Sequence, residues 1–306
     1  MSIGCERKLI KTVDIELFAE DILDLSGDNI KTAVNEIGNE EVWIKEHFEQ
    51  STLDTDNFRD KTYRTSKSRK ELRQKIIDEL FAFERLVDDN ETCLGKGGAK
   101  PIGKNPIKGK KCFLHIGLPA SGKSKIANLI ADKTASYLID PDLVKRKLPE
   151  FNQKGGASLV HAESSEINDS LLSMCMQKGF NIVWPKIGNN FNSIKELAEI
   201  FVKNEYSFYL ILVELDRKIA TQRAYSRFIE TKRYVPLSLI YDGYANDPTL
   251  TYYRMQQKVP HLLSGYLHLD NDVLKGAYPT VIENKGFSPR WLFNENGSIK
   301  TGELIK

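Results

Sequence analysis

Residues 111–124 read KCFLHIGLPASGKS, and this stretch decides the fold class of the chain. Its first half, Cys112–Ile116, is a β-rich run, and Gly117–Ser124 matches the pattern G-x-x-x-x-G-K-[ST]. An amphipathic helix is predicted over Lys123–Lys133, directly after the loop. A strand, a glycine-rich loop and a helix in succession are the context in which this pattern forms a phosphate-binding P-loop. The sequence therefore predicts a P-loop that holds a nucleotide.

The residue types of this loop suit its expected role. Gly117 and Gly122 permit backbone angles that are closed to other residues, so main-chain N–H groups can approach an anion. The N-terminus of the following helix adds partial positive charge. We expect Lys123 to reach the β- and γ-phosphates and the Ser124 hydroxyl to bind Mg²⁺. With ATP or GTP as the donor, the nucleotide-binding set is Gly117, Leu118, Pro119, Ala120, Ser121, Gly122, Lys123 and Ser124.

Outside the loop, short apolar runs alternate with amphipathic stretches. This alternation predicts a mainly parallel sheet flanked by helices, and residues 1–93 add helical periodicity without a strand candidate. The fold class is therefore an α/β P-loop kinase preceded by an all-helical N-terminal region. His115, inside the first strand, is predicted to be a core histidine. Strands are expected at 112–116, 136–139, 180–184, 206–214, 266–269 and 280–282, and helices at 123–133, 158–178, 193–203 and 217–231.

The predicted domain organisation has three segments: a helical region over 1–93, a segment rich in Gly, Lys and Pro over 94–110, and the kinase domain over 111–306. The middle segment has two interpretations. One is a solvated connector between domains. The other is a basic loop that folds over an anionic substrate near the P-loop.

Composition limits the partners of the chain. Its 306 residues are 41% hydrophobic and 28% charged, with a formal net charge of +2, as in an ordinary globular protein. This balance argues against a general nucleic-acid or membrane binder. The four cysteines show no pairing or metal-ligand spacing, which favours a reducing compartment. No apolar segment precedes Cys5, and the longest apolar run, 208–213, is too short to cross a bilayer, so we expect a cytoplasmic protein.

Two aspartates mark the expected acceptor side of the site. Asp140 and Asp142 flank a proline at the end of the second predicted strand, and ligands collect at the carboxyl ends of such strands. We expect Asp142 to be the general base that takes a proton from the attacking hydroxyl, with Asp140 in a supporting or metal-shell role. The alternative is that Asp142 is the N-cap of the next helix.

The stretch from Asp216 to Tyr234 reads DRKIATQRAYSRFIETKRY. Arg223 and Arg227 are four residues apart and share a helical face, and Arg233 follows just beyond. Arginines near a P-loop neutralise the charge that develops on the transferred phosphoryl group. The alternative is a solvated basic helix face.

Four segments together resemble the zeta toxin family of P-loop kinases, which are related to chloramphenicol phosphotransferase. They are GLPASGKS, IDPDLVKRKLPEF (139–151), the helix before KGFNIVW (178–184), and KRYVP (232–236). The resemblance implies transfer of a phosphate from ATP to the amino-sugar hydroxyl of UDP-N-acetylglucosamine. It also implies that Lys123 and Ser124 are the nucleotide and Mg²⁺ residues and that Asp142 is the general base.

Further roles follow from the resemblance by position. Asp169 falls near the acidic residue that contacts the sugar, although Glu163 or Glu166 is an alternative counterpart. Arg233, together with Arg223 or Arg227, resembles the family's pair of phosphate-binding arginines.

One departure bears on the acceptor. Where the family commonly has Glu-Gly-Thr after the third strand, this chain has Pro185-Lys186-Ile187-Gly188. A proline thus replaces a carboxylate, and Lys186 either pairs with a substrate phosphate or lies in solvent. The alternative acceptors are a dinucleotide cofactor, a nucleic-acid end or an antibiotic. A third reading is a nucleotide-binding regulator without catalysis.

The N-terminal helices suggest regulation. Zeta toxins are typically silenced by a small helical antitoxin, so a partner of this kind is expected in cis or in trans. If residues 1–93 inhibit in cis, deleting residues through about Asn90 raises the kinase rate or toxicity.

Overall fold

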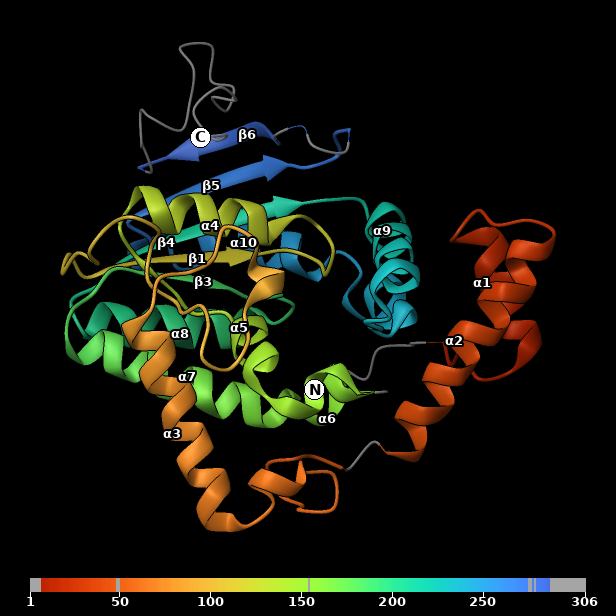
Figure 1. Ribbon diagram of the computed structural model, residues 1–306. Helices are drawn as coiled ribbons and strands as arrows, with labels where there is room; N and C mark the ends of the chain where they lie inside the picture. Colours follow the sequence, from red (N-terminus) through yellow and green to blue (C-terminus); the bar gives the residue numbers. More distant parts are fainter. Residues whose placement is uncertain (1–6, 48–49, 154, 275–276, 278, 287–306) are drawn as a thin grey trace. The chain divides into compact units, whose positions relative to one another are not determined.

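The computed structural model describes residues 7–47, 50–153, 155–274, 277 and 279–286. These residues form a six-stranded sheet in the order β2-β3-β1-β4-β5-β6. Neighbouring strands β1 and β4, and β4 and β5, are parallel, whereas β6 is antiparallel to β5 (Figure 1). The strands are β1 (Lys111–Ile116), β2 (Tyr137–Leu138), β3 (Ile182–Pro185), β4 (Ser207–Glu214), β5 (Gly265–Asp270) and β6 (Thr280–Lys285). The predicted α/β fold and its mainly parallel sheet are confirmed.

The helices agree closely with the periodicity of the sequence. Two predicted helices, 123–133 and 217–231, are found with the same bounds, and the predicted helix 158–178 is divided at Val160 into α6 and α7. The helices are α1 (Thr12–Asp21), α2 (Asp28–Glu46), α3 (Ser66–Ala82), α4 (Lys123–Lys133), α5 (Pro141–Lys147), α6 (Gly156–Leu159), α7 (His161–Gln177), α8 (Phe191–Lys203), α9 (Arg217–Thr231) and α10 (Asp247–Lys258), with a π-helix η4 (Leu239–Tyr244). The predicted N-terminal helices are thus present as α1 to α3.

The chain divides into two compact units. The first unit contains residues 1–34, 110–129 and 183–306, and the second contains residues 35–109 and 130–182. The boundaries at 93 and 110 that the sequence suggested stay a prediction.

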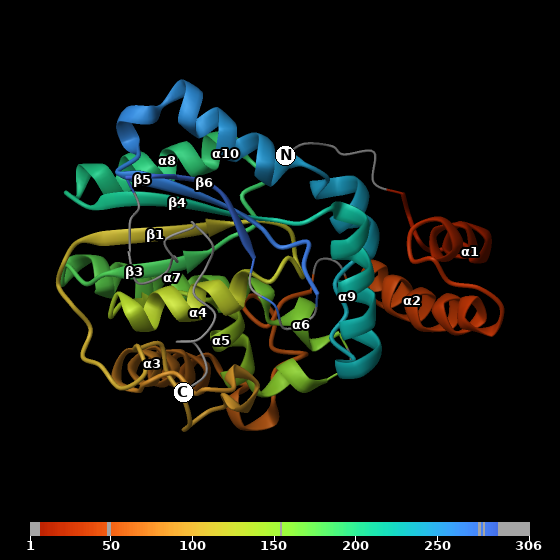
Figure 2. The same cartoon turned by 90° about the horizontal axis from the view of Figure 1, so that it is seen from above.

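The first unit is built on β1 and β4. Both strands are apolar along nearly their whole length and are buried, as expected for central strands of a parallel sheet. His115 is fully buried in β1, and burial lowers its pKa to about 3, so the ring is neutral at physiological pH. Helices α8 and α10 pack together against β4 (Figure 2).

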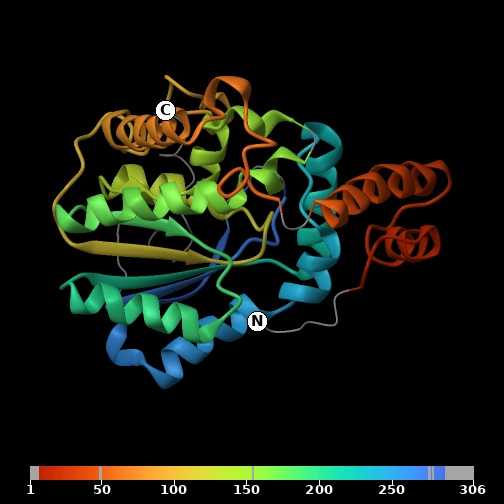
Figure 3. The same ribbon diagram turned by 90° about the horizontal axis from the view of Figure 1, so that it is seen from below.

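In the second unit, α3, α5 and α7 pack against one another (Figure 3). Leu72, Ile76 and Leu80 give α3 its buried face. The loop after α3 is held closely. The Gly98 N–H donates a hydrogen bond to the Glu84 carbonyl, and a Cβ atom on Gly98 would lie 2.1 Å from the Phe83 carbonyl oxygen. Part of the Gly/Lys/Pro-rich segment is therefore fixed within this unit.

Among the described residues, no helix combines the length and the apolar character that crossing a membrane requires.

Candidate functional site

The P-loop follows β1 directly and has the backbone that its glycines allow. Gly117 and Gly122 have φ angles of 153° and 87°, and Ala120 also has a positive φ of 60°. A Cβ atom on Gly117 would lie 2.4 Å from the Val213 carbonyl oxygen, so only glycine fits there. The Lys123 ammonium donates to the carbonyl oxygens of Gly117 (2.7 Å) and Leu118 (2.5 Å). The lysine therefore folds over the mouth of the loop.

The loop has the chemistry to hold phosphates. Ser121 is fully buried, and its hydroxyl has no hydrogen-bond partner among the residues that the structure describes. Such a group is costly unless a ligand or water satisfies it. Ser124 is exposed in the first turn of α4, where the helix dipole favours anions. The described residues contain no cluster of three or more His, Cys, Asp or Glu side chains suited to a metal, so Mg²⁺ would rest on Ser124 and on nucleotide oxygens.

Asn271, just after β5, braces the P-loop and was not found by sequence reasoning. Its side-chain amide donates to the Ser121 carbonyl at 2.6 Å, and its backbone N–H donates to the Glu214 carbonyl. A Cβ atom on Gly122 would lie 2.3 Å from the Asn271 amide nitrogen. Nothing in the sequence around Asn271 distinguishes it from an ordinary polar loop residue, so its role depends on the tertiary contact.

A cavity of about 440 Å³ lies beside the start of the P-loop, at the carboxyl ends of β4 and β5. Gly117, Leu118, Glu214 and Thr249 are among its lining residues. Glu214 accepts hydrogen bonds from Thr249 (2.8 Å) and pairs with His268 (2.7 Å). The His268 hydrogen bond lowers the pKa of Glu214 in spite of partial burial, which keeps this wall of the cavity anionic.

The three candidate arginines lie in the first unit with the P-loop. Arg223 is on α9, and its guanidinium donates to the carbonyl oxygens of Asn271 (3.3 Å) and Val273 (3.0 Å). Arg227 is exposed on the same helix. Arg233 lies beyond the end of α9, which terminates at Lys232 with a left-handed φ of 56°. Arg223 is therefore directed at the same post-β5 loop that braces the P-loop.

Residues 185–188 lie beside the end of β1. The Lys186 N–H donates to the His115 carbonyl, and the Gly117 N–H donates to the Ile187 carbonyl. The Lys186 ammonium lies over the Trp184 ring at 4.2 Å from its centroid. The segment thus contacts the first residue of the P-loop through its backbone.

Asp140 and Asp142 lie in the second unit. The N-cap of α5 is Asp140, whose carboxylate accepts from the Asp142 N–H at 2.9 Å, so the alternative that Asp142 is the cap is wrong. The Asp142 side chain is 55% exposed, and its carboxylate pairs with Lys145 at 3.0 Å. Burial, reinforced by the neighbouring Asp142, raises the pKa of Asp140 to about 6.

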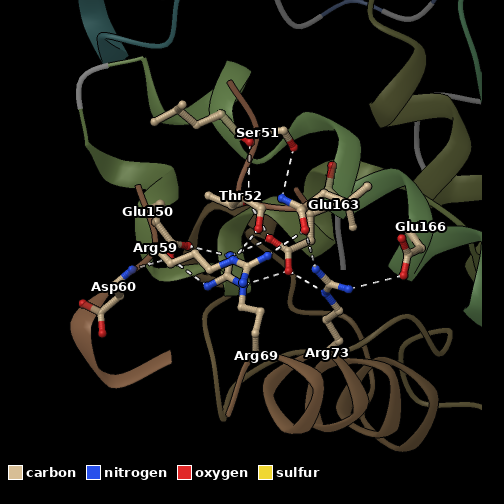
Figure 4. Close-up of polar contacts among 12 residues, drawn as sticks. Ser51, Thr52, Arg59, Asp60, Arg69, Arg73, Glu150, Glu163 and Glu166 are labelled. Atoms are coloured by element: carbon tan, nitrogen blue, oxygen red, sulfur yellow. Dashed lines mark hydrogen bonds and ion pairs between the residues drawn. The ribbon is translucent and has the colours of Figure 1, made fainter. Parts of the chain in front are cut away.

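The three acidic candidates on α7 differ sharply in environment. Glu166 and Asp169 are exposed, whereas Glu163 is fully buried. Both Glu163 oxygens accept hydrogen bonds from Arg69, and they also accept from Thr52 (2.5 Å) and Arg73 (2.7 Å) (Figure 4). Although burial raises its pKa, these hydrogen bonds bring the Glu163 pKa below its ordinary value. Glu163 is thus satisfied by the chain itself.

The second carboxylate of this cluster, Glu150, is also fully buried. Arg69 donates to both of its oxygens, at 2.7 and 3.1 Å, and the Asp60 N–H donates to one of them at 2.7 Å. Arg69 itself is 1% exposed, so it joins two buried carboxylates from helix α3 (Figure 4). We call Arg69, Glu150 and Glu163 the buried ion cluster. In the sequence these three residues look like ordinary charged residues of amphipathic stretches, so the cluster was not predicted.

We compared the chain with protein families, curated proteins and solved structures. Residues 100–246 match the family model described as Zeta toxin. No curated protein matches the chain in sequence. Among solved structures, one is described as the PezAT chromosomal toxin-antitoxin system of Streptococcus pneumoniae, with 14% identity, a TM-score of 0.47, and coverage of 60% of this chain and 74% of that chain.

A second similar structure is described as AvrRxo1-ORF1:-ORF2 with ATP, with 17% identity, a TM-score of 0.49, and coverage of 71% of this chain and 67% of that chain. Both structural likenesses are too distant to carry a functional conclusion. The family match is more direct, because it spans the P-loop, Asp142 and the arginines of α9. Residues 100–246 therefore match the zeta toxin family, and this match supports a nucleotide-binding phosphotransferase.

Proposed function

We propose that the chain is an ATP-dependent kinase that transfers the γ-phosphate to a hydroxyl of a nucleotide sugar, with UDP-N-acetylglucosamine as the acceptor. The observation that supports it most is the P-loop, in which Lys123 folds over the mouth and the buried Ser121 hydroxyl lacks a partner among the described residues. Such a loop is suited to β- and γ-phosphates. The zeta toxin match over residues 100–246 supports the acceptor class.

In the proposed mechanism, the acceptor oxygen attacks the γ-phosphorus in line with the leaving oxygen. The new O–P bond forms as the bond to the β–γ bridging oxygen breaks, ADP leaves, and the acceptor proton passes to the Asp142 carboxylate. Lys123 stabilises the charge on the phosphate oxygens, aided by Arg227, Arg233 and Arg223. When bound at Ser124, Mg²⁺ would neutralise charge on the β- and γ-phosphates.

The α5 N-cap supports the assignment of Asp142 as base. The backbone N–H of Asp142 donates to the Asp140 carboxylate, which fixes the first turn of α5. This gives the Asp142 side chain a defined starting point on the helix. Lys145, 3.0 Å from the Asp142 carboxylate, favours the ionised form that a base requires. Glu166 and Asp169 are the exposed carboxylates that we propose for acceptor hydroxyl groups, since Glu163 is already satisfied.

A second acceptor class is favoured by one observation. Pro185 and Lys186 stand where the family commonly has a glutamate, and their segment bonds to the end of β1 and to Gly117. A basic side chain in place of a carboxylate favours an acceptor with more negative charge, such as a dinucleotide cofactor. A nucleic-acid end and an antibiotic are further alternatives, and a regulator without catalysis is the alternative outside enzymology.

The partners of the chain follow from the same family. We propose that a helical antitoxin, in cis or in trans, restrains the kinase. The PezAT system is described as a toxin-antitoxin system, and the zeta toxin match supports a partner of that kind for this chain.

Mass spectrometry tests the proposal directly. The full chain is incubated with ATP, Mg²⁺ and a panel of nucleotide sugars, dinucleotides, oligonucleotides and antibiotics, and the compound that gains a phosphate is identified. We expect Lys123→Met to lower turnover by about 10²–10³-fold, and Asp142→Asn to lower it by about 10²–10⁴-fold.

Two exposed residues of α8 supply matched controls. Lys195→Met and Glu199→Gln remove the same charges from a surface pair and should leave turnover unchanged. Full turnover by Asp142→Asn would show that the base is another group. Absence of transfer to every compound in the panel would favour the non-catalytic regulator.

A further inference from the structure

The first described residues of the chain contact the arginine-bearing helix α9 and the neighbouring π-helix η4. We call residues 7–24 the N-terminal clamp. They lie in the same compact unit as the P-loop, α9 and η4. Leu9, Ile15 and Phe18 of the clamp are fully or almost fully buried, so its hold includes apolar packing.

The apolar half of the contact is an aromatic and guanidinium stack. Phe18 meets Tyr241 of η4 edge to face, with ring centroids 6.3 Å apart. Arg7 lies over both rings, 5.4 and 5.6 Å from their centroids, and it pairs through two nitrogens with the Asp242 carboxylate at 2.8 and 3.1 Å. Arg217, the first residue of α9, also lies over the Tyr241 ring, at 4.5 Å from its centroid.

The polar half of the contact is made on α9 itself. The Lys218 ammonium pairs with the Asp24 carboxylate at 2.7 Å. One turn further along, the Gln222 amide donates to the other Asp24 oxygen at 2.8 Å and to the Ile22 carbonyl at 2.9 Å. The clamp thus fixes two successive turns of α9 through side chains at i and i+4.

The clamp and the candidate arginines occupy different faces of α9. Successive residues of an α-helix are about 100° apart around its axis. Arg223 therefore lies roughly 120°, and Arg227 roughly 160°, from the middle of the face that Lys218 and Gln222 present. Arg223 is held there by the carbonyls of Asn271 and Val273. The clamp therefore contacts the face of α9 roughly opposite to the arginines and leaves the arginine face uncovered.

We propose that the N-terminal clamp is a positioning element of the phosphotransfer site: Arg7 and Asp24 hold α9 in the placement from which Arg223 and Arg227 act on the nucleotide. The inference rests on the proposed kinase function. It is opposite in sign to cis-inhibition by this segment, because a positioning clamp raises the rate of phosphate transfer, whereas an inhibitory one lowers it.

Point variants in the full chain test whether the clamp raises or lowers the rate of phosphate transfer. We expect Arg7→Ala combined with Asp24→Asn to lower kcat/KM for ATP by about 3- to 10-fold, which is the range that losing one or two partly exposed ion pairs produces. KM for the acceptor should not change. The control is Asp28→Asn, which removes a more exposed aspartate (94% against 61% for Asp24) that pairs with Lys31 and not with α9, and it should behave as wild type.

Two further measurements separate positioning from a general loss of structure. Asp24→Lys alone should also lower the rate, and combining it with Lys218→Asp, which rebuilds this pair with exchanged charges, should restore most of that loss. On an Arg223→Ala/Arg227→Ala background the clamp variant should cost less than about 2-fold, because the arginines that the clamp positions are already gone. The proposal would be overturned if the losses from the clamp variant and from the arginine variants were fully additive, or if the exchanged pair restored no activity. A rate above wild type in the clamp variant would also overturn it.

Hydrogen exchange and nucleotide affinity keep the test independent of turnover. Peptides of α9 should exchange faster in the clamp variant than in wild type, with peptides of α8 unchanged, and affinity for ATPγS should fall by a similar 3- to 10-fold. If the wild-type chain transfers no phosphate, the kinase proposal fails while these two measurements still decide on the clamp. Unchanged exchange in α9 together with unchanged affinity would refute it.

Discussion

Replacing Arg69 by methionine should be among the most destabilising single substitutions in the second unit. The guanidinium is 1% exposed and makes hydrogen bonds to all four carboxylate oxygens of Glu150 and Glu163, which are both fully buried. Methionine fills a similar volume, so the change removes the charge while leaving little empty space. Two buried carboxylates then remain with too few partners.

The size of the stability loss depends on the hydrogen bonds that Glu150 and Glu163 retain without Arg69. Glu163 keeps its hydrogen bonds from Thr52 and Arg73, and Glu150 keeps the Asp60 N–H. Breaking a buried ion pair by removing one partner typically costs about 3–5 kcal/mol. Because partners remain on both carboxylates, we expect a loss of about 3 kcal/mol in the free energy of unfolding at pH 7.5. This is a large part of the roughly 5–15 kcal/mol that holds an ordinary domain together.

The assay is urea unfolding followed by circular dichroism, at pH 7.5 and pH 5. Without Arg69 the lowered pKa of Glu163 rises, so the variant binds more protons when folded and its stability deficit relative to wild type shrinks as the pH falls. Lys195→Met, in an exposed pair with Glu199, is the control and should change stability by less than about 0.5 kcal/mol. A loss below about 1 kcal/mol for Arg69→Met, or a deficit that grows at pH 5, would refute the reasoning.

Because of the buried ion cluster, deleting the N-terminal residues is not a clean test of cis-inhibition. Removing residues through Asn90 takes away Arg69, Arg73 and the buried face of α3, and leaves Glu150 and Glu163 without their arginine partners. We therefore expect that truncated chain to lose its fold rather than to gain kinase rate. Point variants in the full chain are the sharper test of cis-inhibition.

Three further predictions concern single residues. Asp140→Asn keeps the helix cap but removes a carboxyl whose raised pKa makes wild-type stability fall as the pH rises from about 4 to 6. In urea unfolding the variant should therefore be roughly 1–3 kcal/mol more stable than wild type at pH 7.5. At pH 4 it should be no more stable than wild type. Gly98→Ala places a Cβ atom against the Phe83 carbonyl and should cost about 1–3 kcal/mol in the same assay, a result that an unchanged midpoint would contradict. Asn271→Asp turns the donor to the Ser121 carbonyl into an anion beside the phosphates and should raise KM for ATP at least about 10-fold in steady-state kinetics, with stability little changed.

Sequence patterning predicted the framework of the fold because the relevant signals are local. The strand before Gly117 is a continuous apolar run, and α9 begins after Asp216, whose carboxylate accepts from the N–H groups of Lys218 and Ile219. Such patterns need no knowledge of distant residues. The predicted strands at 266–269 and 280–282 were found for the same reason, with bounds extended by neighbouring polar residues.

The parts that escaped prediction depend on contacts between residues far apart in the chain. Glu163 has the charge of a substrate-binding residue in the sequence, yet Arg69 and Thr52 satisfy it from 94 and 111 residues away. Asn271 reaches the P-loop across 150 residues. Asp140 and Asp142 show a subtler limit. Two aspartates around a proline suggest either a cap or a base, and only the backbone geometry shows that Asp140 is the cap.

The buried ion cluster also sets an order of events during synthesis. Arg69 is translated 81 residues before Glu150 and 94 residues before Glu163. At roughly 5–20 residues per second, helix α3 waits about 5–20 s for the carboxylates that neutralise it. Throughout that interval Leu72, Ile76 and Leu80 have no finished surface to pack on. A nascent chain that stalls before Glu163 therefore presents an uncovered apolar helix to chaperones and proteases, so the cell can remove it before a complete kinase exists.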